Sequence, residues 1–228
     1  MQAEEELAIY YNNAIKQTNV NTEHLFDDVS KDFISCVEEL SANKCKVGMD
    51  IGYGYGNYTL CMLDHDFYVD AIDLIETDMI FHRIPQLKVE ERFNAFKCNI
   101  MNFQFKRKYD LVVAKDVLHF LSENDMRRIL NCIKKWSKKN AINYFVVFTN
   151  ITRKDKRGKI KYINGEARLS QNELIEIINS IYSDWMIEIK SENYIEYDKY
   201  NEGYYFKAIK NTIIVKNRKG EIKNGTGE

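Results

Sequence analysis

The chain has 228 residues, of which 45% are hydrophobic and 29% charged, and it contains a single proline. This composition is that of a folded, soluble α/β protein and excludes a disordered chain. The 33 basic and 34 acidic residues give a formal net charge of -1, so no overall positive field attracts nucleic acid or an anionic membrane.

The cysteines and the amino terminus bear on the cellular compartment. The five cysteines are scattered and lack the spacing of metal ligands, so we expect buried thiols in a reducing compartment, with no metal site and no disulfide framework. The first residues, MQAEEELAIYY, contain neither a basic leader nor a long apolar stretch, and no segment is long enough to cross a bilayer. These features predict a cytoplasmic protein that contacts no membrane.

In chain order, helical sequence comes first. Between residues 3 and 40, apolar side chains recur at the spacing of one face of a helix. Residues 46–51 are then a short apolar strand that leads directly into the sequence GYGYG, and residues 57–63 favour a helix. The chain therefore changes at this point from helices to an alternation of strands and helices.

That alternation continues to the carboxyl terminus. Further strands are expected at 67–72, 94–98, 109–114, 141–149, 185–189 and 205–215. A helix at 79–87 should stop near Pro85, and two more should begin at Ser122 and Ser170, each followed three residues later by an acidic residue. The charged, irregular residues 150–167 are interpreted as a mobile loop or short lid.

The order of these elements predicts a single α/β domain. We expect a helical N-terminal extension or cap over residues 1–42, a Rossmann-like core over 43–216, and a flexible tail over 217–228.

The glycine cluster follows the first predicted strand. That strand ends in Asp50 and is followed by three alternating glycines, Gly52, Gly54 and Gly56. Glycines adopt backbone conformations closed to other residues and let a ligand approach the main chain. Asp73 ends the next strand, where its carboxylate can accept hydrogen bonds from two ribose hydroxyls. Together these residues outline an adenosine site.

The spacing of the glycines distinguishes between two cofactors. A dinucleotide enzyme favours GxGxxG, in which a helix N-terminus meets a pyrophosphate, but Asn57 stands where the third glycine of that motif would be. The pattern is GxGxG, with Asp50 two residues ahead. That acid would repel a pyrophosphate, whereas it suits the sulfonium and ammonium of S-adenosylmethionine.

On these motifs the sequence resembles the class I S-adenosylmethionine-dependent methyltransferases. The matching segments are DIGYGYGNY, VDAIDL and YDLVVAKDVLHFL, followed by the helix ENDMRRILNCIKKW, and they span about residues 46–148. The spacing GYGYGN and the C-terminal elements look most like the small-molecule branch that includes tellurite and thiopurine methyltransferases. The resemblance implies a mostly parallel seven-stranded sheet, helices on both faces, and an antiparallel last strand.

The resemblance also implies a set of cofactor-binding residues. The family's adenine-contacting acid falls at Asn99, where this sequence has an amide that can still hydrogen-bond the adenine amino group through its oxygen. The implied set is Asp50, Gly52, Tyr53, Gly54, Gly56, Asp73, Leu74, Asn99, Ile100 and Lys115.

The residues after the fourth strand bear on the methyl acceptor. This strand ends in AKDVLHF and lacks the Asn/Asp-Pro-Pro-Tyr motif with which related enzymes hold a planar amine, so methylation of a nucleobase or a glutamine amide is disfavoured. His119 and Asp116 are the candidates for a base. His119 can equally be a packed core residue, and Asp116 can equally cap a helix or touch the cofactor's methionine end. Tyr10 and Tyr11 lie on a helix that could close over the site and contact the substrate.

The sequence therefore predicts an S-adenosylmethionine-dependent methyltransferase that acts on a small molecule by in-line displacement. Three alternatives stay open: a methyltransferase acting on a peptide or tRNA, a catalytically inactive S-adenosylmethionine-binding partner subunit, and a nicotinamide oxidoreductase. Neither the acceptor atom nor the oligomeric state follows from the sequence.

Overall fold

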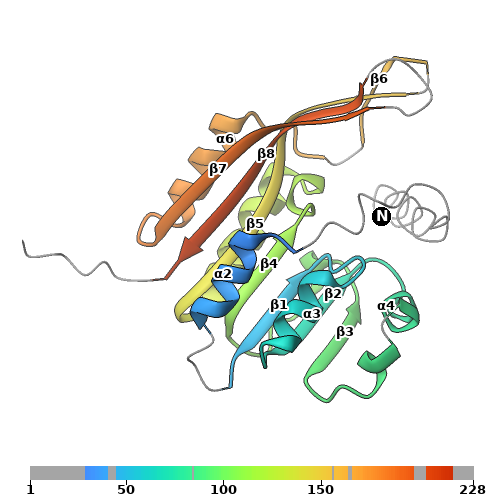
Figure 1. Ribbon diagram of the computed structural model, residues 1–228. Coiled ribbons are helices and arrows are strands. Elements are labelled where there is room, and N and C mark those ends of the chain that lie inside the picture. Colours follow the sequence, from blue (N-terminus) through green and yellow to red (C-terminus); the bar gives the residue numbers. More distant parts are fainter. Residues whose placement is uncertain are drawn as a thin grey trace, which may run out of the picture.

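A computed structural model describes residues 29–40, 45–83, 85–155, 157–163, 166–197 and 204–217 (Figure 1). Most of the predicted extension 1–42 lies outside these residues, as do Tyr10 and Tyr11. So does the predicted tail after Asn217. Of the extension, the structure describes helix α2 (Lys31–Leu40).

One sheet organises the described residues. Its strand order is β3-β2-β1-β4-β5-β8-β7, with β6 paired to β5. The strands are β1 (Val47–Ile51), β2 (Tyr68–Asp73), β3 (Phe93–Lys97), β4 (Tyr109–Lys115), β5 (Ser137–Lys154), β6 (Ile160–Lys161), β7 (Met186–Tyr197) and β8 (Tyr204–Lys216). Strands β1 to β5 pair in parallel, whereas β8 runs antiparallel to both β5 and β7. The predicted Rossmann-like sheet with an antiparallel last strand is confirmed, and β6 makes it an eight-stranded sheet.

Helices cover both faces of this sheet (Figure 1). They are α2, α3 (Asn57–Asp64), α4 (Thr77–Arg83), α5 (Glu123–Trp136) and α6 (Gln171–Ile181), with short 3-10 turns η2 (Pro85–Lys88), η3 (Ile100–Asn102) and η4 (Leu118–Phe120). The alternation of side chains along β5 separates two cores. Tyr144 and Val146 pack with α2 and α3, whereas Phe145 and Val147 pack with α5 and α6.

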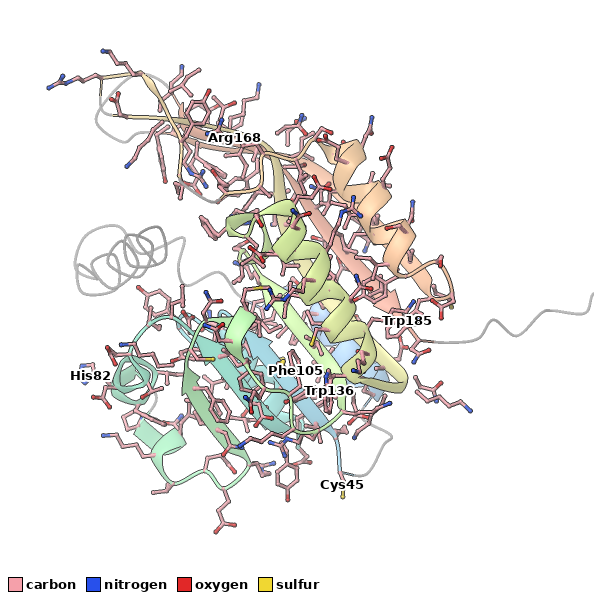
Figure 2. All side chains as sticks on the ribbon, turned by 180° about the vertical axis from the view of Figure 1, so that it is seen from behind. Cys45, His82, Phe105, Trp136, Arg168 and Trp185 are labelled. Atoms are coloured by element: carbon pink, nitrogen blue, oxygen red, sulfur yellow. The ribbon has the colours of Figure 1, made fainter. Side chains whose placement is uncertain are left out.

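The starts of α5 and α6 are as the sequence predicts. Ser170 and Glu173 form a reciprocal capping box at the start of α6, and the Ser122 hydroxyl accepts a hydrogen bond from the Asp125 amide at the start of α5. On the α5 side, the rings of Phe105 and Trp136, both labelled in Figure 2, stack with centroids 6.0 Å apart. These contacts fix α5 against the segment that leads into β4.

The segment 150–167 differs from its predicted loop. Strand β5 continues to Lys154, where it pairs with β6, while Arg153 also pairs with Phe206 of β8. Residues 151–154, β6, residues 193–197 and residues 204–208 thus form an extension of the sheet, here called the β-arm, which projects beyond the body of the domain in Figure 1. The sequence did not predict this part of the strand, because its charged residues do not alternate with apolar residues that would form a buried face.

Two smaller expectations also change. Helix α4 ends at Arg83, and the 3-10 turn η2 begins at Pro85, because proline lacks the N–H that a continuing helix requires. Of the cysteines, Cys36 is buried, Cys45 is exposed, and Cys61, Cys98 and Cys132 are partly exposed, so the expectation of buried thiols is wrong for most of them. Within the described part of the chain, no helix has the length and apolar character that a membrane crossing requires.

Candidate active site

The loop after β1 takes a shape that glycine permits. Gly52, Gly54 and Gly56 all have positive φ angles, of 72°, 48° and 78°. A Cβ atom on Gly52 would lie 2.0 Å from Cγ2 of Val117, so this part of the loop is packed against the segment that follows β4. A Cβ atom on Gly54 would meet no atom of the described residues within 4 Å, so none of these residues covers the main chain there.

Asp73, at the end of β2, is hydrogen-bonded to the glycine loop. Its Oδ2 atom accepts a hydrogen bond of 2.9 Å from the Gly54 amide, and Oδ1 accepts bonds of 2.7 and 3.2 Å from the amides of Leu74 and Ile75. Burial raises the pKa of Asp73, while these three amides act in the opposite direction. A carboxylate oxygen has two lone pairs, so Oδ2 can accept a further hydrogen bond from a ligand hydroxyl.

Asp50 lies beneath the loop and is 3% exposed. Its Oδ2 atom accepts a hydrogen bond of 2.7 Å from the Thr59 hydroxyl of α3. Burial raises the pKa of Asp50 to about 7, so the group is partly protonated near neutral pH. The sequence argument gave Asp50 a full negative charge, whereas its burial favours the protonated form.

The end of β3 lies next to Asp73. The Cys98 amide donates to the Asp73 carbonyl over 2.8 Å, which brings the following residue, Asn99, to the same edge of the sheet. The Asn99 side-chain oxygen accepts a hydrogen bond of 2.8 Å from the Met101 amide and thereby caps η3, in which Ile100 is buried. Parallel strands thus bring the predicted cofactor residues of β1, β2 and β3 to one edge.

The end of β4 supplies the remaining predicted residues. Lys115 donates to Oδ2 of Asp116 over 2.5 Å, and Asp116 has a φ angle of 59°, which is uncommon for a residue other than glycine. His119 follows in η4 and is 2% exposed. Burial, assisted by the positive charges of Arg153 and Lys115, lowers the pKa of His119 to about 3. The ring is therefore neutral at physiological pH and too weak a base to deprotonate an ordinary hydroxyl or ammonium acceptor.

Several buried polar atoms of this edge form no hydrogen bond. Among the described residues, such atoms occur only in the loops that follow β1 and β4, and they include Tyr53 Oη, Asp116 Oδ1 and His119 Nδ1. Folded proteins pair the large majority of their buried polar atoms, and the exceptions gather where a ligand binds. This clustering makes the carboxyl edge of β1 and β4 the candidate site.

Sequence reasoning missed several residues beside His119. It placed Arg153 in a charged mobile loop, yet Arg153 donates to both carboxylate oxygens of Glu166, over 2.6 and 2.5 Å, in a largely buried pair. The rings of Phe148, Tyr194 and Phe206 pack close by on β5, β7 and β8. No signal in the sequence identified this cluster, because its members meet only through the pairing of distant strands.

Comparison with known proteins identifies the family. Residues 15–214 match the profile of the family described as "Tellurite resistance protein TehB". The chain belongs to the TehB family. No curated protein sequence matches this TehB-family chain. The predicted membership of the class I S-adenosylmethionine-dependent methyltransferases, on their small-molecule branch, is confirmed.

Solved structures share the fold of this TehB-family chain. TehB from Haemophilus influenzae has a TM-score of 0.60 at 16% identity, over 83% of this chain and 63% of that one, so the chain spans less than two thirds of that protein. The 1,6-didemethyltoxoflavin-N1-methyltransferase of Burkholderia thailandensis, solved with bound 1,6-didemethyltoxoflavin and S-adenosylhomocysteine, has a TM-score of 0.62 at 15% identity over 94% and 90% of the two chains. The N-methyltransferase NodS from Bradyrhizobium japonicum, solved with S-adenosylhomocysteine, has a TM-score of 0.57 at 15% identity over 91% and 98%.

Metal ligands were not predicted from the sequence. Within the described part of the chain, no group of three or more His, Cys, Asp and Glu side chains is arranged to hold a metal ion.

Proposed function

We propose that this TehB-family protein transfers the methyl group of S-adenosylmethionine to a small-molecule acceptor at the carboxyl edge of β1, β2 and β4. The observation that supports this function best is the hydrogen bond from the Gly54 amide to the Asp73 carboxylate, at a point where no described residue covers the main chain of the loop. A nucleoside can approach the loop at that point, and the Asp73 carboxylate can accept its ribose hydroxyls.

The proposed cofactor residues divide by the part of the cofactor that they would hold. Asp73 and Leu74 would hold the ribose, and Asn99 and Ile100 the adenine. The methionine portion would lie along Gly52, Tyr53, Gly54 and Gly56, near Lys115 and Asp116. Asp50 would act through its charge from below the loop, because its carboxylate is already bound to Thr59. S-adenosylmethionine supplies a methyl group on a sulfonium, and transfer leaves a neutral thioether while the acceptor donates an electron pair to the methyl carbon.

The contribution of the protein to that reaction is mainly alignment and exclusion of water. His119 is neutral and weakly basic, so an acceptor that must lose a proton would have to lose it to solvent or to another group. This favours an acceptor atom that already presents a lone pair. Tyr10 and Tyr11 remain proposed substrate contacts.

Calorimetric titration of S-adenosylmethionine into a Gly54→Arg variant tests the cofactor site. We expect binding to be lost, because the new side chain would fill the open space above the loop. Gly158→Arg is the matched control, since Gly158 also has a positive φ angle, of 74°, and open space beside it, but it lies in the turn before β6. Unchanged binding in Gly54→Arg, with a melting temperature like that of the control, would place the cofactor elsewhere.

Catalysis needs a separate measurement. The release of S-adenosylhomocysteine in the presence of a pool of small-molecule acceptors is expected for the wild-type protein. Cofactor binding without any release, from this pool or from peptides and tRNA, would instead support the inactive partner subunit.

A further inference from the structure

A cluster of aromatic rings lies next to the end of β4. The centroid of His119 is 5.3 Å from that of Phe148, and Phe148 in turn lies 5.0 Å from Tyr194 and 5.3 Å from Phe206. These four residues, here called the ring cluster, come from η4, β5, β7 and β8. Three of them lie at or beside the start of the β-arm. Because β5 lies on one side of β4 in the sheet and β2, with Asp73, on the other, the ring cluster adjoins the proposed methyl-transfer site on the side away from Asp73.

The cations beside the ring cluster are all matched by carboxylates. Arg153 stacks over the Phe206 ring at 4.9 Å and is bound to Glu166, whose side chain is 4% exposed. Lys115, the other cation that acts on His119, is paired with Asp116. Lys210, over the Tyr194 ring, is paired with Glu192, and the Tyr194 hydroxyl donates a hydrogen bond of 2.7 Å to the Glu196 carboxylate, so these described groups leave no cation unmatched. An anionic acceptor would therefore lose its hydration without gaining an unmatched counter-charge, which is costly.

One polar atom of the ring cluster lacks a partner. His119 Nδ1 is buried and forms no hydrogen bond within the described residues. A neutral imidazole nitrogen is either a donor or an acceptor, so a ligand with an N–H or a ring nitrogen can satisfy it. Apolar rings around one unsatisfied polar atom are typical of a small-molecule site, in which the rings provide affinity and the polar atom fixes orientation.

We propose that the ring cluster is the acceptor subsite and that it takes an uncharged, planar aromatic molecule, held by a hydrogen bond to His119 Nδ1. This inference rests on the proposed function and names its class of substrate. It separates this chain from enzymes whose acceptor is an inorganic oxyanion, because the subsite has no unpaired cation among its described residues to receive one.

Ligand-observed NMR in the presence of S-adenosylhomocysteine measures the affinities of defined probes. At mildly alkaline pH, benzimidazole is uncharged and carries both an N–H and a ring nitrogen, whereas benzothiophene has the same shape without them. We expect the wild-type protein to bind benzimidazole more tightly than benzothiophene, and not to bind benzoate measurably. Tellurite, which has no carbon-bound proton to observe, should fail to displace benzimidazole.

Variants of His119 test the hydrogen bond. His119→Phe should weaken benzimidazole by about tenfold or more while changing benzothiophene little, because the probe then loses a buried partner. His119→Asn keeps a polar atom near the position of Nδ1 and should retain more of the benzimidazole affinity. Titration of S-adenosylhomocysteine alone should be unaffected, which distinguishes failure of the subsite from failure of the cofactor site.

A variant of Glu166 tests the charge balance. Glu166→Gln leaves Arg153 without its carboxylate and should allow benzoate to bind, with affinity at least about tenfold above that of the wild type. Asp184→Asn, which breaks an exposed pair with Lys134 beside α6, is the matched control and should leave benzoate unbound. Equal weakening of both ring probes by His119→Phe, equal loss of benzimidazole in the Asn and Phe variants, or tight binding of tellurite to the wild type would overturn the proposal.

Discussion

Burial strongly shifts the pKa of Asp50. Burial raises its pKa from an ordinary value of 3.8 to about 7, so the folded protein retains a proton that the unfolded chain has lost over this range. A raised pKa contributes stability that is complete below the unfolded value and is lost as the pH rises through the folded value. The free energy of unfolding should therefore fall between pH 3.8 and about 7 on account of this group.

The Asp50→Asn variant removes that dependence. Its amide oxygen can still accept the Thr59 hydrogen bond, so the melting temperature of the variant should rise relative to wild type, by several degrees, between pH 3.8 and about 7. Asp70→Asn provides a control with a different pH window, because hydrogen bonds from Arg107, Asn94 and Tyr109 outweigh burial and lower the pKa of Asp70, so the stability that Asp70 contributes is lost only below pH 3.8. A constant difference between Asp50→Asn and wild type across this range would contradict the assignment.

Gly52 and Gly54 differ in what surrounds them, although both have positive φ angles. Gly52→Ala combines backbone strain with a clash against Val117, so we expect a loss of about 2–4 kcal/mol in the free energy of unfolding. Gly54→Ala introduces only the strain of a positive φ angle and should lower the free energy of unfolding by about 1–2 kcal/mol. Urea unfolding measures both, and Val117→Ala should partly rescue Gly52→Ala. Equal losses for the two glycines would show that the clash relaxes without cost.

Sequence reasoning found the residues whose role is local. The glycine loop, Asp50 and Asp73 follow one another around a strand-turn-helix unit, and their backbone requirements can be read from residue types. The Arg153–Glu166 pair and the three rings that surround His119 were missed, since they depend on strand register and on the environment of each group.

Among the elements, the parallel core was predictable and the β-arm was not. Strand β4 was recognised because its residues are nearly all apolar, as expected for a strand covered on both faces. In β7 most side chains are exposed or half-buried, and its second half, like the end of β5, extends past the helices that would impose an apolar pattern. A strand that no helix covers does not need a buried apolar face, so its sequence lacks the alternation of apolar and polar residues by which strands are recognised.

The capping box of α6 gives a prediction at this scale. Ser170→Ala removes the hydroxyl that accepts the Glu173 amide and should lower the free energy of unfolding by about 1 kcal/mol. Glu173→Gln keeps a side chain that can bond back to the Ser170 amide, so its loss should be smaller. Thermal melts of the two variants compare these effects, and a larger loss for Glu173→Gln would assign the stability to its charge rather than to the box.

At the scale of the molecule, the last strand of the described chain, β8, lies within the sheet rather than at its edge, close to the first described helix, α2. It lies between β5 and β7, although it is the last strand in sequence, and its Ile213 and Ile214 point into opposite cores. Helix α2 is attached to the same centre, because the Ser30 hydroxyl is 2.7 Å from that of Tyr144 on β5. Both termini of the described chain thus contribute to the middle of the sheet, and we propose that the chain is a single domain.

A single domain should unfold as one unit, and Ile213→Ala tests this. Ile213 is fully buried in β8, so the substitution should cost about 2–5 kcal/mol. Because the sheet connects β8 to β1 through β5 and β4, that loss should shift every signal together. Far-ultraviolet circular dichroism, the fluorescence of Trp136 and Trp185, and protection by S-adenosylhomocysteine should all move to the same lower urea midpoint.

Exposed Lys207 of the β-arm is the control, since Lys207→Ala should change the free energy of unfolding by less than about 0.5 kcal/mol. If cofactor protection stayed at its wild-type midpoint while the tryptophan signal moved, the glycine-loop half and the β8 half would be separate folding units.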